Sequence, residues 1–400
     1  MSAVNRRARF RLRERGWYVV MRVALAAGEL VTRLLVIIAP LIPTPRDRDL
    51  AIYLFNPLES DGHYRRFKVF FPLLEKDGVD FELFHVLKDP SAMATLDGPP
   101  APRYRMFARV YWQRLFQVIK ARRFKQVLIQ RNLFPSYPDK KFPHLERLCR
   151  QLCDDITVDF WDPVYLWDPE VTGRSLEYVD RLVCDNSRLL TAFTDRFRHE
   201  RAFTWPIAVD LGRYEEKVDY AIHHPVRLLY TGSYIAVRHH LEPLMPILDE
   251  LHRATPITLT VIGIRGPHTE VSFPVRHMTW DKDTYFRTLA ESDIALFPFF
   301  LDDDELNNLR VAGKTLDYMA SGLPFVGSPQ GLAEGVHHED VMFAVESNDR
   351  EEWHNALVTL INEPTLRSRL GTNSRTFIAT YCPVPTMYQR LREILATPVL

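Results

Sequence analysis

The sequence predicts an α/β protein made of two doubly wound domains, each with a mainly parallel sheet. Its 400 residues exceed what one hydrophobic core comfortably fills. Short apolar stretches alternate with helical patterns, and the alternation starts again after a linker around residues 205–225. Because strands that alternate with helices pair in parallel through right-handed crossovers, each half is expected to form a Rossmann-like sheet, with a cleft between the halves.

The composition is that of a soluble globular protein, with 46% hydrophobic and 26% charged residues. The 51 basic and 51 acidic residues cancel, so the chain is not expected to bind nucleic acid as a polycation. Four cysteines lack paired CxxC spacing, which indicates buried free thiols in a reducing compartment rather than a disulfide or a metal site. They are Cys149, Cys153, Cys184 and Cys382.

The amino terminus departs from this neutrality, because residues 1–22 carry seven arginines against one acid. An apolar run follows over 23–43, but Glu29 and Arg33 interrupt it and would be costly at membrane depth. An amphipathic helix on an anionic membrane surface fits this pattern better than a span. A helix packed on the protein, with a basic tail in solvent, fits it equally well. A cleaved signal peptide is disfavoured, since no small-x-small site follows the run.

The first domain is predicted from five apolar stretches separated by helical patterns. The expected strands are 50–55, 79–87, 126–130, 156–162 and 179–186. Helical patterns cover 67–78 and 108–124. The turn after the first strand carries His63, Tyr64 and Arg65.

The second domain repeats the alternation, and most of its strands run into a glycine. The expected strands are 226–232, 257–263, 293–299 and 323–328, and the expected helices are 241–255, 281–292, 313–322 and 351–381. The last helix is expected to break near Pro364 and Gly371. The predicted division of the chain is a basic amphipathic segment (1–45), a first domain (46–215), a second domain (216–382) and a final helix (383–400) that returns to the first domain.

Lys314 stands in the first turn of a predicted helix, where the helix dipole repels a cation. With Asp317 it forms an i,i+3 pair, and the plain interpretation is a surface ion pair worth about 0.2–0.5 kcal/mol. An anion in front of the helix would better explain the lysine, since ligands of parallel sheets bind beyond the strand ends, against helix amino termini. We therefore expect a nucleotide diphosphate beside Lys314 and ribose hydroxyls beside Asp317.

The stretch GKTLDYMASGLPFVGSPQGL (313–332) resembles the donor-site segment of the group 1 (family 4-like) retaining glycosyltransferases of GT-B architecture. LLYTGS, TVIG, ESDIALFPF and EEWHNALVTLINEP match the family in the same order, and VDFWD resembles its aspartate-bearing strand. The likeness covers about 50–390 and is strongest over 225–345. It implies two Rossmann-like domains that face a central cleft, with a nucleotide sugar as donor. It also implies transfer to a hydroxyl of a glycan, glycolipid or cell-envelope precursor, with retention and with neither a metal nor another cofactor.

The resemblance also implies a donor-binding set, in which Lys314 contacts the pyrophosphate and Asp317 the ribose. The full set is Gly232, Ser233, Arg238, Gly263, Asn308, Lys314, Thr315 and Asp317. Two positions depart from the family pattern: Ser233 replaces a frequent arginine, and Leu309 replaces the first of two acids spaced eight residues apart. Asn308 is therefore the candidate for the sugar contact. The acidic run 302–305 beside it has the pattern of a solvated loop.

On the acceptor side, Asp159 and Asp162 end a predicted strand and are the catalytic candidates. Either one would orient or deprotonate an acceptor hydroxyl, or would simply cap the following loop. The acceptor-binding candidates are His63, Tyr64, Arg65 and Arg131. The remaining histidines lack the spacing of a metal site, and none is expected.

The sequence thus favours a cytoplasmic sugar transferase, peripheral to the inner face of the plasma membrane, whose partners are a nucleotide sugar and a glycan or lipid-linked acceptor. A non-catalytic nucleotide-sugar-binding or assembly protein on the same scaffold is the alternative, because Leu309 and Ser233 depart from the pattern of active members.

Overall fold

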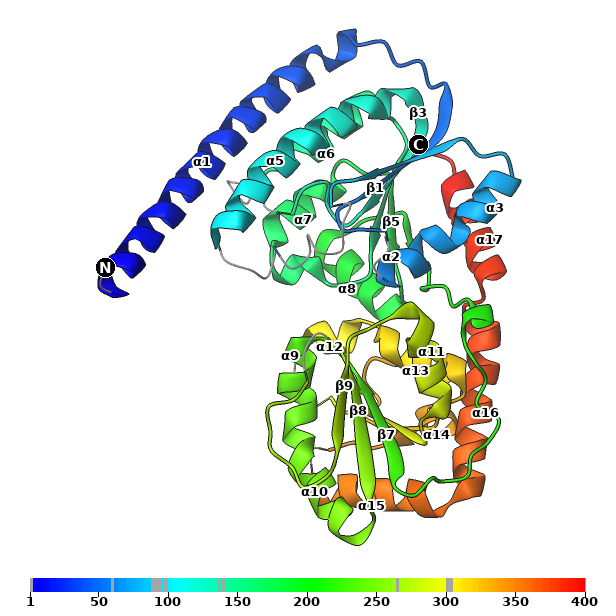
Figure 1. Cartoon of the computed structure of the whole chain (residues 1–400). Coiled ribbons are helices and arrows are strands. Elements are labelled where there is room, and N and C mark those ends of the chain that lie inside the picture. The colour runs from blue at the N-terminus through cyan, green and yellow to red at the C-terminus, as the bar shows by residue number, and fades with distance from the viewer. Residues whose placement is uncertain are drawn as a thin grey trace. The chain divides into compact units, whose positions relative to one another are not determined.

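The structure is a computed structural model of the chain, and it describes residues 3–58, 61–87, 95, 100–135, 137, 141–263, 266–299, 305–347 and 349–399. The chain divides into two units (Figure 1). The first unit comprises residues 1–207 and 387–400, and the second comprises residues 208–386. Each unit contains one parallel sheet of six strands, which confirms the predicted fold class.

The sheet of the first unit has the order β2-β1-β3-β4-β5-β6. Its strands are β1 (Arg48–Leu54), β2 (Phe81–His85), β3 (Phe124–Gln130), β4 (Ile156–Phe160), β5 (Arg181–Cys184) and β6 (Ala202–Thr204). Ile52 of β1 pairs with Leu83 on one side and Leu128 on the other. Chain order reverses between β1 and β3, so the topological switch point of this sheet lies there, where open parallel sheets bind ligands.

Helices pack around this sheet, and three of them (α3, α5 and α17) overlap the predicted helical patterns 67–78, 108–124 and 383–400. They are α2 (Asp61–Arg66), α3 (Phe71–Lys76), α5 (Pro100–Ile119), α6 (His144–Leu152), α7 (Pro169–Leu176), α8 (Ser187–Phe197) and α17 (Val384–Ala396). Three of the four cysteines lie in this unit. All four are buried and free, as predicted.

Helix α1 (Ala3–Ile38) is one continuous helix that ends in a 3-10 turn at Ala39–Leu41. One of its faces packs on α5 and α6. Thr32 Oγ1 lies 3.1 Å from Tyr111 Oη, and a Cβ added at Gly28 would lie 2.5 Å from the Tyr111 ring. Glu29 Oε1 lies 3.5 Å from His144 Nε2, so this charge of the apolar run faces the protein.

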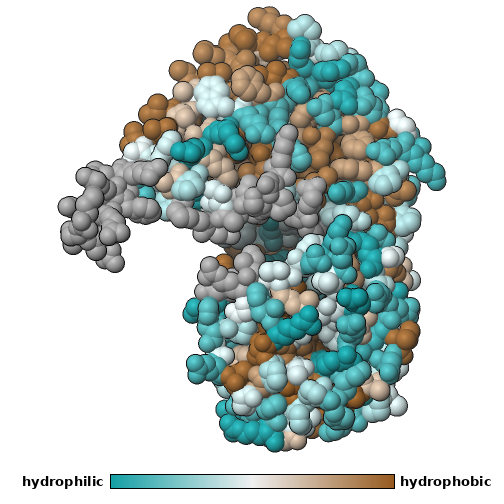
Figure 2. All heavy atoms as spheres, in the orientation of Figure 1, coloured by the Kyte–Doolittle hydropathy of each residue, from teal (hydrophilic) through white to brown (hydrophobic). Residues whose placement is uncertain are grey.

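The opposite face of α1 exposes large apolar side chains. Leu30, Leu34 and Ile37 are 60%, 55% and 73% exposed. Figure 2 shows hydrophobic atoms gathered over the part of the surface that α1 forms. By length and composition, a helix within Glu14–Leu41 is also apolar enough to cross a membrane, although its packing on α5 and α6 accounts for one face. The helix therefore packs on the protein, which was one of the two interpretations of the sequence. Its other face leaves an apolar surface exposed.

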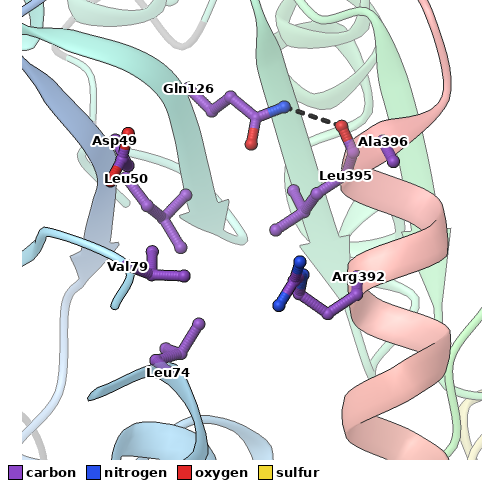
Figure 3. A pocket seen from close by; sticks show the side chains of 8 residues that line it. All are labelled: Asp49, Leu50, Leu74, Val79, Gln126, Arg392, Leu395 and Ala396. Carbon is purple, nitrogen blue, oxygen red and sulfur yellow. Dashed lines mark hydrogen bonds between the residues drawn. The ribbon is translucent and has the colours of Figure 1, made fainter. Parts of the chain in front are cut away.

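Helix α17 closes the first unit from the far end of the chain. Tyr388 Oη donates to Asp77 Oδ2 (2.8 Å), and Trp205 Nε1 donates to the Met387 carbonyl (2.9 Å). Gln126 Nε2 donates to the Leu395 carbonyl (2.6 Å), at the edge of a pocket of about 260 Å³ (Figure 3). This pocket lies at the amino ends of β1 and β3, whereas parallel sheets bind ligands at the carboxyl ends. It is a packing gap beneath α17, away from the candidate sites.

The sheet of the second unit has the order β12-β11-β10-β7-β8-β9. Its strands are β7 (Val226–Thr231), β8 (Ile257–Ile262), β9 (Val275–Met278), β10 (Ile294–Phe297), β11 (Phe325–Gly327) and β12 (Phe343–Ala344). Chain order reverses between β7 and β10, and the ends of these two strands mark the second switch point.

The helices of the second unit follow the predicted order, with one correction. They are α9 (Tyr234–Ala236), continuing through a π turn (Val237–Leu241) and a 3-10 turn (Glu242–Leu244) into α10 (Met245–Ala254), then α11 (Lys282–Glu291), α12 (Glu305–Leu309), α13 (Gly313–Ser321), α14 (His338–Val341), α15 (Arg350–Asn362) and α16 (Pro364–Tyr381). The break before Pro364 is confirmed, but the break predicted near Gly371 is wrong. A Cβ on Gly371 would lie 2.2 Å from the Gly322 carbonyl oxygen, so this glycine serves the close packing of α16 on the end of α13.

Candidate functional site

Lys314 lies at the switch point of the second sheet. Its Nζ is 4.5 Å from the ring centroid of Tyr230, at the end of β7, and 5.2 Å from that of Phe297, at the end of β10. Phe299 contributes a third ring at 5.6 Å. The same Nζ donates a hydrogen bond of 3.3 Å to Tyr230 Oη. The first turn of α13 thus carries its cation into a cluster of aromatic faces, which attract a cation that has lost part of its water.

Among the described residues, the charged group that acts on Lys314 is another cation, Arg310. Burial, and to a smaller extent the positive charge of Arg310, lowers the pKa of Lys314 to about 7. The Arg310 guanidinium donates to Asn307 Oδ1 over 3.1 Å. Sequence analysis missed Arg310, although it stands four residues before Lys314 and directly after Leu309. Two cations at a strand-end switch point form a site suited to an anion.

Asp317 is placed one turn deeper in α13 and is 4% exposed. Its Oδ1 accepts a hydrogen bond from Tyr214 Oη (2.6 Å), and its Oδ2 accepts one from Tyr285 Oη (2.7 Å). Both carboxylate oxygens are therefore engaged within the unit. The two tyrosines come from segments far from Asp317 in sequence, and no sequence signal connected them to it.

The two predicted donor-site glycines pack against each other. A Cβ on Gly263 would lie 2.3 Å from the Gly232 carbonyl oxygen, and a Cβ on Gly232 would lie 2.9 Å from the Tyr230 ring. The amide of Gly232 donates to the Ile262 carbonyl over 3.0 Å. Close packing of the β7 and β8 ends is thus sufficient to explain both glycines. Residues 264 and 265 of the same loop lie outside the described residues.

Ser233 and Arg238 lie on the segment that follows β7. Ser233 Oγ accepts from the Ala236 amide (3.2 Å), and the Ser233 carbonyl accepts from the Val237 amide (2.9 Å), so Ser233 begins the helix. Arg238 Nε lies 3.6 Å from Glu242 Oε2. The two residues are one helical turn apart, and the arginine side chain is 50% exposed.

The remaining predicted donor residues differ in exposure. Thr315 is fully buried, and its hydroxyl donates to the Ala312 carbonyl (2.7 Å). Asn308 is exposed on α12, one residue from Asn307. The acidic residues 302–304 lie outside the described residues. The structure thus brings Lys314 together with the β7 and β10 ends and holds Thr315 within the packing of the unit.

Asp159, at the carboxyl end of β4, forms an ion pair with Arg66 of α2, and both side chains have no exposed surface. Arg66 Nε donates to both carboxylate oxygens, over 3.1 and 3.0 Å. The guanidinium also lies 4.0 Å from the ring centroid of Trp205. This arrangement stabilises the charged carboxylate and directs it at Arg66. Sequence analysis missed Arg66, which adjoins Arg65 in the turn that it singled out.

Asp162 and Arg131 form a second ion pair, nearer to the surface, through Asp162 Oδ2 and Arg131 Nη2. Arg131 directly follows β3 and has a left-handed backbone with φ of +61°. Its guanidinium carbon lies 5.5 Å from the Trp161 ring centroid. Arg131 and Asp162, the two charged residues that the sequence singled out at strand ends, therefore contact each other, and the Trp161 ring lies beside the guanidinium.

His63 joins this group from α2. Its Nε2 lies 3.3 Å from Gln130 Oε1, and its ring centroid is 5.1 Å from that of Trp161. Burial lowers the pKa of His63 to about 4, so the ring is neutral at physiological pH. Arg65 is 3% exposed, and Tyr64 is half-buried. Within the described ranges, no group of three or more His, Cys, Asp or Glu side chains is arranged to hold a metal ion.

Comparison with known proteins found a similar domain and similar folds. No curated protein sequence matches the chain. Residues 225–363 match the family model described as "Glycosyl transferases group 1". Among solved structures, HepE of Anabaena in complex with UDP and glucose is similar in fold, with TM-score 0.59, 12% identity, and coverage of 88% of this chain and 100% of that chain.

Two further structures share the fold. Sucrose-phosphate synthase from Thermosynechococcus elongatus has TM-score 0.64 and 12% identity, covering 87% of this chain and 98% of that one. WaaG, a glycosyltransferase involved in lipopolysaccharide biosynthesis, has TM-score 0.60 and 14% identity, covering 87% and 100%. The fold is therefore GT-B. The second unit contains a group 1 glycosyl transferase domain.

Proposed function

We propose that Lys314 and Arg310 bind the diphosphate of a nucleotide sugar at the switch point of the second unit. The observation that carries this proposal is the placement of Lys314 Nζ over the rings that end β7 and β10, with Arg310 as a second cation close enough to lower its pKa. A bound diphosphate would place negative charge beside both cations. In the transition state the same cations stabilise the charge that develops on the departing diphosphate.

The reaction is transfer of the sugar to a hydroxyl of a glycan or lipid-linked cell-envelope precursor, with retention at the anomeric carbon. The bond between the anomeric carbon and the diphosphate oxygen breaks, the acceptor oxygen bonds to that carbon, and the acceptor proton leaves to a base. Asp162 is the preferred candidate for orienting the acceptor, because its carboxylate is 17% exposed whereas that of Asp159 is fully enclosed by its ion pair. The donor sugar contacts Asn308.

A second candidate function is binding of a nucleotide sugar without turnover. Two observations favour it: Asp159 is held by Arg66, and Leu309 stands where many similar enzymes have an acid. Under this alternative the anion site at Lys314 is unchanged, and only the chemical step is absent.

The experiment that separates these functions measures release of nucleoside diphosphate from a panel of nucleotide sugars, with and without a membrane extract as the source of acceptor. Turnover that depends on the extract supports transfer. Binding of a nucleotide sugar with no turnover on any acceptor supports the second candidate. Lys314→Ala should weaken nucleotide-sugar binding at least tenfold, because a charge-assisted contact is worth about 1.5–3 kcal/mol. Wild-type affinity in this variant would rule out the diphosphate assignment.

We also propose that the exposed face of α1 lies on the anionic inner surface of the plasma membrane, with the arginines of residues 1–22 as its electrostatic contact. Removing the helix is a poor test, since Leu25 and Thr32 are buried against the unit. Replacing Leu30, Leu34 and Ile37 with glutamine removes only exposed apolar surface. We expect this variant to sediment less with anionic liposomes while its stability is unchanged.

Val218→Gln is the matched control, because Val218 is 82% exposed and lies in the second unit. Liposome binding that survives the triple glutamine substitution would contradict the membrane assignment. Equal binding to neutral and anionic liposomes would contradict the part assigned to the arginines.

A further inference from the structure

The first unit has a cavity of about 230 Å³ at the switch point of its sheet. Asn56, just beyond β1, lines it on one side, and Gln130, Arg131 and Asn132, at the end of β3, line it on the other. Thr172 of α7 belongs to the same wall. The cavity therefore occupies, in the first sheet, the position that the Lys314 site occupies in the second.

Several buried polar atoms in this wall have no hydrogen-bond partner in the part of the chain that the structure describes. They are Gln130 Nε2, Arg131 Nε, Asn132 Oδ1 and Thr172 Oγ1. Gln130 is 2% exposed and Thr172 is fully buried. A buried polar atom without a partner costs about 1–3 kcal/mol, and such atoms are rarely gathered around one cavity. A ligand that offers both hydrogen-bond donors and acceptors is therefore expected to enter this cavity.

The chemistry of the wall favours a neutral ligand. The unpartnered atoms include donors (the amide of Gln130 and the guanidinium of Arg131), an acceptor (Asn132 Oδ1) and a hydroxyl that serves as either. The cation of Arg131 is paired with Asp162, and the carboxylate of Asp168 also lines the cavity, so a phosphate would meet a negative charge. A ligand with several hydroxyl groups, each of which both donates and accepts hydrogen bonds, matches this wall better than an anion does.

An aromatic platform completes the cavity. Trp167 lines it and is 56% exposed, which is unusual for so large an apolar side chain. An indole face at the rim of a cavity provides an apolar surface for the C–H groups of a pyranose ring, while the amides and the hydroxyl bond the ring's hydroxyl groups.

We infer that this cavity binds an uncharged saccharide ring, held by Gln130, Asn132 and Thr172 against Trp167. This inference rests on the proposed function, since it names the class of acceptor as a neutral glycan unit rather than a phosphorylated one. The cavity then selects the acceptor, separately from the donor site in the other unit.

The test uses the full-length protein and four methyl glycosides, those of glucose, galactose, mannose and N-acetylglucosamine, with glucose 1-phosphate as the anionic comparison. Saturation-transfer NMR and titration report binding. We expect at least one methyl glycoside to bind more tightly than glucose 1-phosphate. Thr172→Val should weaken that binding at least fivefold, and Thr172→Ser, which keeps the hydroxyl, should restore it. Trp167→Ala should weaken it by a similar factor.

A second measurement keeps folding effects apart from binding. Thr172→Val removes an unpartnered buried hydroxyl, so its melting temperature should equal or exceed that of the wild type while its saccharide affinity falls. Ser175→Ala is the control, because Ser175 is buried on the same helix but donates to the Val171 carbonyl (2.8 Å). It should leave saccharide binding unchanged.

The inference is overturned if no methyl glycoside binds, if glucose 1-phosphate binds and the glycosides do not, or if Thr172→Val binds as the wild type does. Nucleoside diphosphate binding is measured on the same samples. A protein that binds nucleotide but no saccharide leaves the proposed function in place and removes this inference. A protein that binds saccharide but no nucleotide does the reverse.

Discussion

At the scale of single residues, Lys314 is a cation placed among aromatic rings. The aromatic rings of Tyr230, Phe297 and Phe299 replace part of its lost hydration, but they do not neutralise it. Its pKa of about 7 means that the free protein holds the amine only partly protonated at neutral pH. A diphosphate beside it favours the charged form and must raise that pKa.

Nucleotide binding should therefore take up a proton. Because the pKa of Lys314 is about 7 in the free protein and higher in the complex, affinity is fully present below pH 7 and falls as the pH rises through the pKa of the complex. We expect the dissociation constant for nucleoside diphosphate to rise by up to about tenfold per pH unit above pH 7. Calorimetric titration in buffers of different ionisation enthalpy measures both the change in the dissociation constant and the number of protons taken up on binding.

Lys314→Arg is the control for this linkage, since a guanidinium stays charged throughout the range. Its binding should be almost independent of pH between 7 and 9. A wild-type protein with an equally flat profile would show that Lys314 does not contact the diphosphate.

Asp159 gives a second prediction at this scale. Asp159→Asn leaves the Arg66 guanidinium buried without its counter-charge, and we expect a loss of about 3–5 kcal/mol in the free energy of unfolding. Urea denaturation measures it. The double variant Arg66→Met with Asp159→Leu should recover most of the loss. A stable Asp159→Asn variant with lost turnover would instead identify this carboxylate as catalytic.

Some of these residues were predictable and others were not. Lys314 stood out because its charge conflicts with the helix dipole, and Asp159 and Asp162 because they end an apolar strand. Arg66 meets Asp159 across 93 positions of sequence, and the tyrosines on Asp317 come from other segments. Such pairs depend on strand order, which the apolar pattern of a single segment does not contain.

At the scale of elements, two glycines of the second unit differ in what a Cβ atom would contact. A Cβ on Gly327, at the end of β11, would lie 2.0 Å from the Phe297 carbonyl oxygen, whereas a Cβ on Gly313 meets nothing within 4 Å. Gly327→Ala should lower the free energy of unfolding by about 1–3 kcal/mol, because two parallel strands must separate.

Gly313→Ala is the matched substitution in the same unit. It should leave stability unchanged or slightly higher, because alanine favours the first turn of α13. Thermal denaturation of both variants measures the difference. Equal destabilisation by the two substitutions would contradict the packing explanation for Gly327.

The elements themselves were largely predictable from periodicity. The buried strands and the helix that ends at Gly322, with φ of +69°, lie where the sequence predicted them. Strands β6, β9 and β12, which span two to four residues, were missed. Gly371 was misread as a helix break, because a glycine that accommodates a neighbouring helix looks the same in sequence as one that ends a helix.

At the scale of the whole molecule, the first unit is completed by a segment from the end of the chain. The side chains of Met387, Tyr388 and Leu391 are buried, and Arg181 Nε donates to the Thr397 carbonyl over 3.1 Å. Removing residues 387–400 should destabilise the first unit and leave the second folded. Scanning calorimetry should show the first unit's transition lowered or lost, and limited proteolysis should leave the second unit as the resistant fragment.

Tyr388→Phe is a milder version of the same change, since it removes only the hydroxyl that donates to Asp77. It should lower the same transition by a smaller amount. A truncated protein in which both units unfold as in the wild type would show that α17 contributes nothing to the first unit.

The return of α17 also has a consequence during synthesis. The second unit is an uninterrupted stretch of chain, so it can finish folding as soon as it has left the ribosome. The first unit begins earlier but lacks its last helix until Val384–Ala396 has been made, and the surface that α17 covers stays open meanwhile. A domain that is made first is thus finished last, and a nascent chain that stalls before residue 387 carries a complete second unit and an unfinished first unit.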